Sequence, residues 1–437
     1  MPALFFVCYN IVGLLFITFL IKLFELSICR IKMIYLDNAA TTRLEKKAFE
    51  AMLPFLGDEY GNASAVYDIA RRSKKAVFFA RKQCASVIGA SPSEIFFTSG
   101  GSESDNWALA GAYETYRRRS KEHGSTAADS VASESVVSCG HIITTAIEHH
   151  AVLRTAEYLE SLGVSVTYLK PDSEGYISPL QVTGAMRPDT FLVSVMTANN
   201  EIGTIEPVRE IAAAVRNIRK DVLIHTDAVQ AFGQIDLKDM AGCVDLLSAS
   251  AHKLGGPKGV GLMYIRDGIK FPPYIRGGMQ ESGRRAGTEN IAGIAGFGAA
   301  SEYALSSLDE RIETETVLRD RLISGLKKIP EVIINGSYSV GDHERRLPGN
   351  VSVCINGIEG ESALIMLDRE GICASSGSAC ASGAREPSHV LQAIGRAYDE
   401  SKGSLRFTIS HRNTEEEIDT AVIKITDIVM KLRDNRR

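Results

Sequence analysis

The chain has 437 residues, of which 45% are hydrophobic, and a formal net charge of −4. This length and composition allow a large core, and we expect two lobes. The 49 basic residues do not exceed the 53 acidic ones, which argues against a nucleic-acid-binding protein and leaves no nucleic-acid partner to expect.

The first 32 residues differ from the rest of the chain. Residues 3–21 are apolar and uncharged, and a span of about 20 such residues is long enough to cross a bilayer. Lys22, Arg30 and Lys32 follow it and would keep the remainder in the cytoplasm. Alternatively, translation begins at Met33, which we favour over an anchor. We therefore expect a cytoplasmic protein, with a membrane contact only if residues 1–32 form an anchor.

Strand and helix patterns alternate after Met33, and a predicted helix at residues 103–116 follows the first predicted strand. Repeated strand–helix units predict an α/β fold with a mostly parallel sheet and helices on both faces. The predicted strands span residues 95–97, 141–144, 164–169, 191–197, 223–225 and 245–247.

The last third of the chain predicts a smaller α+β lobe. Residues 292–328 are helical in pattern and would link the two lobes. The small lobe would then hold strands at 332–334 and 351–354 and a helix at 414–432. Residues 120–138, rich in Ser, Ala and Glu, predict a flexible surface insertion.

The eight cysteines form no CxxC pair, which fits a reducing compartment and predicts no structural metal site. We expect Cys84, Cys243 and Cys354 to be inert core residues, and Cys373 to be buried in a strand. Cys380 differs, because residues 375–383 are small, polar and glycine-rich, as in an exposed mobile loop. A thiol there becomes a nucleophile if its pKa is lowered or a base lies nearby.

Lys253 follows a short apolar strand and precedes residues 255–257, Gly-Gly-Pro, which stop the strand. A lysine at a strand end can form a Schiff base with a carbonyl cofactor, although taken alone it is better interpreted as an ordinary loop residue. Asp227 ends another strand and could keep a pyridine nitrogen protonated, or cap a helix. His149 could stack on a flat ring and move protons, or be structural.

Residues 98–104 lie between a strand and a helix and form a phosphate cradle in outline. Each of these groups lies at the carboxyl end of a predicted parallel strand, where open α/β sheets bind ligands. Cradle, ring-nitrogen acid, imidazole and lysine together predict a pyridoxal 5′-phosphate (PLP) site.

Over residues 33–432 the chain resembles the cysteine desulfurases of the NifS/IscS type, and its cysteine loop is similar to that of the longer-loop group. The resemblance implies a PLP-dependent transferase of fold type I with a seven-stranded sheet. It divides the chain into a leader (1–32), a large domain (45–308) and a small domain (33–44 with 309–437). The matching segments are residues 35–42, 97–106, 148–149, 199–203, 227–230, 251–253, 375–382, 386–391 and 405–407.

The resemblance also implies residue roles. Lys253 forms the Schiff base and moves protons, His149 stacks on the ring, and Cys380 takes the sulfur from L-cysteine to leave L-alanine and a persulfide. Arg406 would bind the substrate carboxylate, with Asn38 close by. The remaining implied contacts with PLP are made by Gly101, Ser102, Ser250 and His252 at the phosphate, Asp227 at the ring nitrogen, Gln230 and Asn200 at the O3′ side, and Thr288 at the phosphate of a second subunit.

The implied partners are a second copy of the chain and a sulfur-acceptor protein, such as an iron–sulfur scaffold or a tRNA-thiolation protein. Cys380 is also expected as a transient iron–sulfur ligand, with no structural metal elsewhere. Two alternatives remain: a selenocysteine lyase, and a membrane-tethered partner protein with a vestigial site. The retained Lys253, Asp227, His149, Cys380 and Arg406 argue against the latter.

Overall fold

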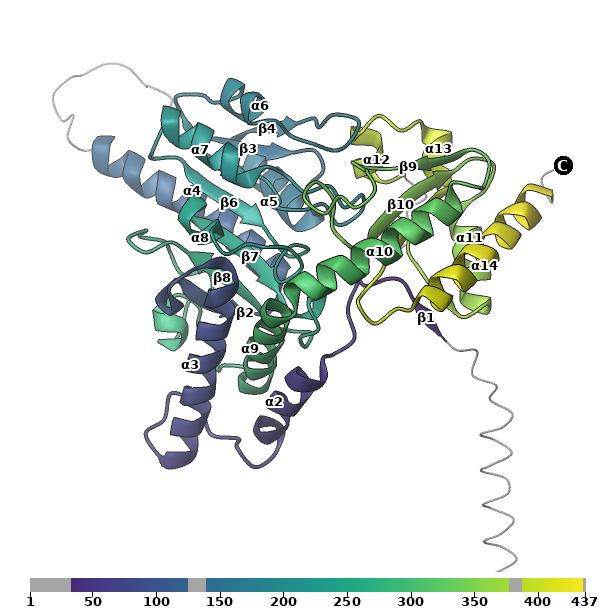
Figure 1. The fold of residues 1–437 in the computed structure, drawn as a ribbon. Helices are drawn as coiled ribbons and strands as arrows, with labels where there is room; N and C mark the ends of the chain where they lie inside the picture. Colours follow the sequence, from purple (N-terminus) through teal and green to yellow (C-terminus); the bar gives the residue numbers. More distant parts are fainter. Residues whose placement is uncertain (1–32, 125–138, 377–386, 435–437) are drawn as a thin grey trace, which may run out of the picture.

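The computed structural model describes residues 33–124, 139–376 and 387–434 (Figure 1). A seven-stranded sheet in the order β2-β8-β7-β6-β5-β3-β4 forms the centre of the larger part. Strands β3 to β7 pair in parallel, and β8 runs antiparallel to both β2 and β7. The predicted mostly parallel sheet is confirmed. The strands are β2 (Ile95–Thr98), β3 (His141–Thr145), β4 (Ser165–Leu169), β5 (Thr190–Ser194), β6 (Leu223–Asp227), β7 (Leu246–Ser250) and β8 (Gly261–Ile265).

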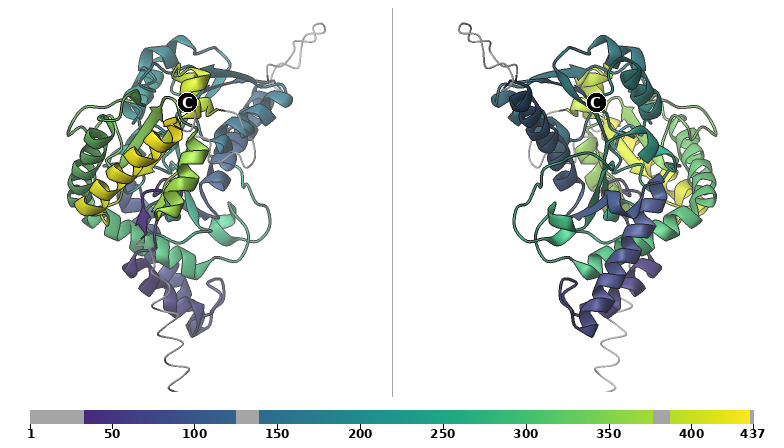
Figure 2. Two further views of the ribbon diagram at one scale, coloured as in Figure 1. Left: turned by 90° about the vertical axis from the view of Figure 1, so that its right-hand side faces the viewer. Right: turned by 90° about the vertical axis from the view of Figure 1, so that its left-hand side faces the viewer.

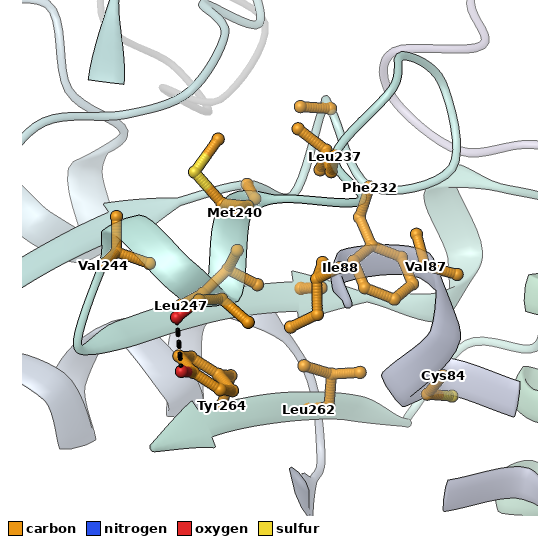
Figure 3. Close-up of a cluster of buried hydrophobic side chains, with 14 of the residues drawn as sticks. Cys84, Val87, Ile88, Phe232, Leu237, Met240, Val244, Leu247, Leu262 and Tyr264 are labelled. Carbon is orange, nitrogen blue, oxygen red and sulfur yellow. Dashed lines mark hydrogen bonds between the residues drawn. The ribbon is translucent and has the colours of Figure 1, made fainter. Parts of the chain in front are cut away.

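Both faces of this sheet are buried except at the edge strand β4, which is partly buried. Adjacent residues of one strand enter different cores: Leu246 packs in one hydrophobic cluster and Leu247 in the other, as expected because side chains alternate across a strand. Figure 3 shows the cluster that includes Leu247, where Phe232 and Ile88 pack over the strands and the Tyr264 hydroxyl donates to the carbonyl of Ala241 at 2.9 Å.

Helices cover these two faces. Helix α4 contacts β7, β8 and α5, whereas α3 and α2 pack against α9. The α2–α3 pair extends away from the sheet at one end of the molecule (Figures 1 and 2). The helices of this part are α2 (Lys46–Leu56), α3 (Asp68–Ile88), α4 (Gly101–Gly124), α5 (His150–Ser161), α6 (Pro179–Gly184), α7 (Val208–Ile218), α8 (Met240–Cys243) and α9 (Ile291–Ser306), with single turns η1 (Pro92–Glu94), η2 (Ala251–Lys253) and η3 (Gln280–Gly283).

A smaller α+β part lies beside the large sheet (Figure 1). Its antiparallel sheet has the order β12-β10-β9, and the N-terminal strand β1 pairs in parallel with β11. Helices α10, α11 and α14 pack on these strands around a separate core. The elements are β1 (Ile34–Tyr35), α10 (Leu308–Leu326), β9 (Val332–Ile334), β10 (Asn350–Ile355), α11 (Gly360–Arg369), β11 (Ile372–Cys373), α12 (His389–Ala393), α13 (Tyr398–Lys402), β12 (Ser404–Thr408) and α14 (Glu415–Asp434).

The structure corrects several local predictions. Helix α4 continues to Gly124, so residues 120–124 belong to a helix and not to the predicted insertion, whose remainder lies outside the described residues. Cys243 is only partly buried, because it ends the four-residue helix α8, where its thiol donates to the carbonyl of Asp239. Cys373 is half-buried in the two-residue strand β11. No helix within the described ranges could span a membrane, and residues 3–21 lie outside them.

Candidate active site

Lys253 lies in the turn η2 directly after β7, at the carboxyl edge of the parallel strands. Its Nζ donates to the carbonyl oxygens of Ala39 and, at 2.9 Å, of Ala40. The Ala39 carbonyl also accepts from Gln230 Nε2 at 3.0 Å, and Thr42 Oγ1 donates to the carbonyl of His252 at 2.9 Å. The segment after β1 therefore crosses the end of the large sheet at the lysine.

Asp227 is the last residue of β6 and pairs in register with Ser248 of β7. Its carboxylate is 5% exposed and accepts from the backbone N–H of Val229 at 2.8 Å. Burial raises the pKa of Asp227 to about 6, against the charge of Lys253, which lowers it. A buried carboxylate that is ionised at neutral pH can accept a hydrogen bond from a protonated ring nitrogen and keep the proton on that nitrogen.

His149 immediately precedes α5, and its Nδ1 accepts from the backbone N–H of Ala151 at 3.1 Å. That bond assigns the ring proton to Nε2. Burial, then the charge of Lys253 and the nearby His150, lower the pKa of His149 to about 4. The imidazole is therefore neutral at physiological pH, which suits a ring that stacks on an aromatic cofactor.

The predicted phosphate cradle lies at the start of α4. A Cβ on Gly101 would lie 2.5 Å from Val229 Cγ2 and 3.7 Å from Ser250 Cβ, so only glycine lets the helix begin this close to the turn after Asp227. The first N–H groups of a helix have no intrahelical partner and favour an anion. Ser102 is exposed in this first turn, and Ser250 is buried at the end of β7.

His252 and Thr288 complete the predicted phosphate contacts. His252 Nδ1 lies 3.2 Å from Thr41 Oγ1, and burial and the charge of Lys253 lower its pKa to about 4. Thr288 is exposed, three residues after Arg285. The Arg285 guanidinium binds Glu103 in the first turn of α4, with Nε 2.9 Å from Oε1, so the Thr288 segment is tied to the cradle helix.

Arg406 lies in β12 of the smaller part and is 5% exposed. Its Nη1 donates to the carbonyl of Asn200 at 3.0 Å, and its Nη2 donates to Asp37 Oδ1 at 3.0 Å. Asn38 Nδ2 donates to the carbonyl of Thr408, two residues along the same strand, at 2.7 Å. The predicted substrate residues therefore lie where the N-terminal segment, β12 and the loop after β5 meet.

Most of the predicted residues converge on the carboxyl edge of the large sheet, whereas Cys380 lies outside the described residues. Sequence reasoning missed Asp37 and Glu201 as partners of Arg406. Both stand inside segments that carried the family resemblance, and their charge in otherwise uncharged stretches was the available signal. Within the described ranges, no group of three or more His, Cys, Asp or Glu residues could hold a metal ion.

The residues present fit PLP. Four features lie together around one edge of the sheet: a glycine at which a Cβ would clash with its neighbour, a buried acid with a raised pKa, a neutral imidazole and the lysine. Gly101, Ser102, Ser250 and His252 would hold the phosphate, and Lys253 would hold the aldehyde carbon.

The chain is similar to known proteins over most of its length. Residues 34–123 and 121–421 match the family Aminotransferase class-V. The chain is 46% identical over 403 residues to cysteine desulfurase IscS of Methanosarcina thermophila, covering 92% of this chain and 93% of that one. A solved NifS-like protein superposes with a TM-score of 0.80 at 38% identity, covering 91% and 100% of the two chains. A structure of SspA in complex with cysteine has a TM-score of 0.70 at 34% identity, covering 87% and 99%.

Fold and site together define a class of enzymes in which a lysine at a strand end binds PLP. The chain belongs to the aminotransferase class-V family, whose members are PLP enzymes, and within it to the cysteine desulfurases.

Proposed function

We propose that this protein is a PLP-dependent cysteine desulfurase that converts L-cysteine to L-alanine and leaves the sulfur on Cys380. The observation that carries the proposal is the position of Lys253: it lies in the turn η2 directly after β7, and its charge lowers the pKa values of both His149 and Asp227. Desulfurase relatives at 46% identity and the cysteine bound in the SspA structure support L-cysteine as the substrate.

Bound PLP supplies an electron sink for charge that develops at the substrate carbons. Asp227 would accept a hydrogen bond from the ring N–H and keep that proton in place. Neutral His149 would stack on the ring, and Gln230 and Asn200 would contact its O3′ side. Lys253, which would hold the cofactor before substrate binds, would then be the base that takes and returns protons at the substrate carbons.

The substrate carboxylate binds Arg406, whose guanidinium is held by Asn200 and Asp37, with Asn38 beside it. A planar guanidinium matches a carboxylate with two parallel hydrogen bonds. The arginine would thereby fix the orientation of the amino acid in the site.

The sulfur transfer balances without an oxidant. The Cys380 thiolate attacks the substrate sulfur, a new S–S bond forms and the Cβ–S bond breaks. The electron pair of the broken bond remains on Cβ, which takes a proton to become the methyl group of alanine. The products are L-alanine and a Cys380 persulfide, which an acceptor such as an iron–sulfur scaffold then consumes.

We also propose that the protein forms a homodimer, in which Thr288 of one subunit lies at the phosphate site of the other. Exposed apolar side chains on the protruding α2–α3 pair support a partner surface there. They are Phe49, Leu53, Leu56, Phe78 and Phe79, which are between 47% and 65% exposed.

For the domain organisation we propose residues 45–308 as the PLP-binding domain, and 33–44 with 309–437 as the small domain. Pairing of β1 with β11 supports the inclusion of the N-terminal residues in the small domain. We place the enzyme in the cytoplasm.

The test compares the wild-type chain with Cys380→Ala, each prepared from Met33 and as the full chain. We expect both proteins to bind PLP and to show Schiff-base absorbance. With L-cysteine and a reductant, the wild type should form alanine and sulfide in equal amounts, and Cys380→Ala should form no sulfide. Undiminished sulfide release by Cys380→Ala would refute the persulfide role, and a wild type without PLP absorbance would refute the enzyme assignment.

A further inference from the structure

Helix α12 of the small part packs against the loop between β3 and α5, which carries His149. Val390 and Leu391 of this helix are buried in one apolar cluster with Ile147, two residues before His149. Ile147 is itself fully buried. The loop that presents the imidazole therefore has a neighbour in the small part as well as in the large one.

His389, the first residue of α12, contacts the residues on both sides of His149. Its Nε2 lies 3.0 Å from the carbonyl oxygen of Glu148. Because a carbonyl oxygen only accepts, this bond assigns the ring proton of His389 to Nε2. The His389 ring also packs against the ring of His150, with the two centroids 4.7 Å apart.

The large part holds other atoms of the same loop. Glu148 Oε1 accepts from the backbone N–H of Met196 at 2.9 Å, and Asn199 Nδ2 donates to the carbonyl of Ile147 at 2.8 Å. The bond from His389 holds the carbonyl of Glu148 instead. That oxygen belongs to the same planar peptide group as the nitrogen of His149, so this bond fixes the direction in which the chain enters His149.

We propose that His389 is a positioning residue for His149, which holds from the small part the loop that presents the His149 imidazole to the cofactor. The proposal rests on the proposed function, in which His149 stacks on the PLP ring. Its physical reason is that a displacement of about 1 Å at a site can slow the reaction by about a hundredfold. A peptide plane held on the side of the small part leaves the imidazole fewer orientations.

Three variants of the holoenzyme separate the two contacts of His389. His389→Gln keeps an amide N–H near the position of Nε2 but has no ring, whereas His389→Phe keeps a ring but has no donor. His389→Asn keeps the amide on a side chain that is too short to reach the Glu148 carbonyl. His343→Asn is the matched control, because His343 is an exposed histidine of the small part whose Nδ1 also lies 3.3 Å from a backbone carbonyl, that of Gly341.

The first measurement is the visible circular dichroism of bound PLP without substrate, relative to its absorbance. PLP is achiral, so this signal depends on how the surrounding side chains hold the ring. His389→Asn and His389→Phe should lose part of the signal, and His389→Gln should keep it. For alanine formation from L-cysteine, kcat/KM should fall by about tenfold or more in the first two variants and by about threefold or less in His389→Gln.

A double-mutant cycle tests whether His389 acts through His149. His149→Ala alone should also lower the dichroism. In that background, His389→Asn should change neither the dichroism nor kcat/KM much further, because the ring that His389 positions is gone. Urea unfolding of each variant checks that the fold is retained, and if His389→Asn does not fold, His389→Phe serves in the same cycle.

The results that would overturn the inference are specific. One is a wild-type dichroism and kcat/KM in both His389→Asn and His389→Phe. Another is a loss caused by His389→Asn that is equally large with and without the His149 ring. A His389→Gln variant as impaired as His389→Asn would exclude the hydrogen bond as the cause, and His343→Asn should match the wild type throughout. A wild type that binds no PLP or forms no alanine from cysteine instead overturns the proposed function.

Discussion

The fully buried His225 should make this protein sensitive to acid. His225 lies in β6, two residues before Asp227, with Nδ1 2.8 Å from Ser194 Oγ and Nε2 3.1 Å from Ser248 Oγ. Burial lowers the pKa of His225 from 6.5 to about 3. The imidazole is therefore neutral in the folded protein, although it lies 3.7 Å from Asp105, whose own pKa burial raises well above its ordinary value.

The sign and size of the effect follow from linkage. Because the folded pKa is below the unfolded one, His225 contributes stability that is present above pH 6.5 and lost as the pH falls toward 3. Between pH 7 and pH 5 only the unfolded chain gains this proton. At about 1.36 kcal/mol per pH unit below the unfolded pKa, this contribution falls by about 2 kcal/mol.

The assay is urea unfolding of the holoenzyme at pH 7 and pH 5. The single tryptophan, Trp107, is fully buried in α4, and its fluorescence reports unfolding of the large part. His225→Gln should lose about 2 kcal/mol less between the two pH values than the wild type. The exposed His343→Gln is the control and should lose as much as the wild type.

All other titrating groups are common to both proteins and cancel in this comparison, except where they contact His225. The experiment is therefore repeated in an Asp105→Asn background, since Asp105 is the titratable neighbour of the ring. If His225→Gln loses the same stability as the wild type in both backgrounds, the burial argument is wrong.

Three further predictions concern the site. Lys253→Ala should abolish turnover and the Schiff-base absorbance, and the pKa of His149 measured by NMR should rise, because the lysine charge contributes to lowering it. Gly101→Ala should lower the free energy of unfolding in urea by about 1–3 kcal/mol and weaken PLP binding in equilibrium dialysis, since its Cβ would lie 2.5 Å from Val229 Cγ2. Adding Val229→Ala to this variant should restore much of the stability and of the PLP affinity. No restoration would contradict the steric cause. Arg406→Lys should raise KM for L-cysteine by about tenfold or more with a smaller effect on kcat, because lysine keeps the charge but loses the planar fork; an unchanged KM would remove Arg406 from the substrate site.

The sequence predicted the elements that local patterns specify. The largely apolar residues 191–197 contain most of β5, because a strand buried on both faces needs near-continuous hydrophobic residues. Strand β8 was missed, although its residues are apolar. Its place between β2 and β7 depends on antiparallel pairing with both neighbours, which no local pattern encodes.

The chemistry of single groups could likewise be predicted, whereas their environments could not. Lys253, Asp227 and His149 were found because each follows a predicted strand, and parallel strands end at one edge. The pKa values of Asp227 and His149 depend first on burial, which only the packed structure determines.

By itself, the sequence determined the α/β class and the PLP chemistry, because residue type and order along strands decide these, whereas Cys380 as the nucleophile stays a prediction. Tertiary structure alone decided the surroundings of Arg406. Asp37 and Arg406 are 369 residues apart in the chain, and they meet only because the segment after β1 packs against β12 of the small part. The physical reason is that hydrogen bonds and pKa shifts depend on distance and burial in space, which residues far apart in the chain acquire only when the two parts fold together.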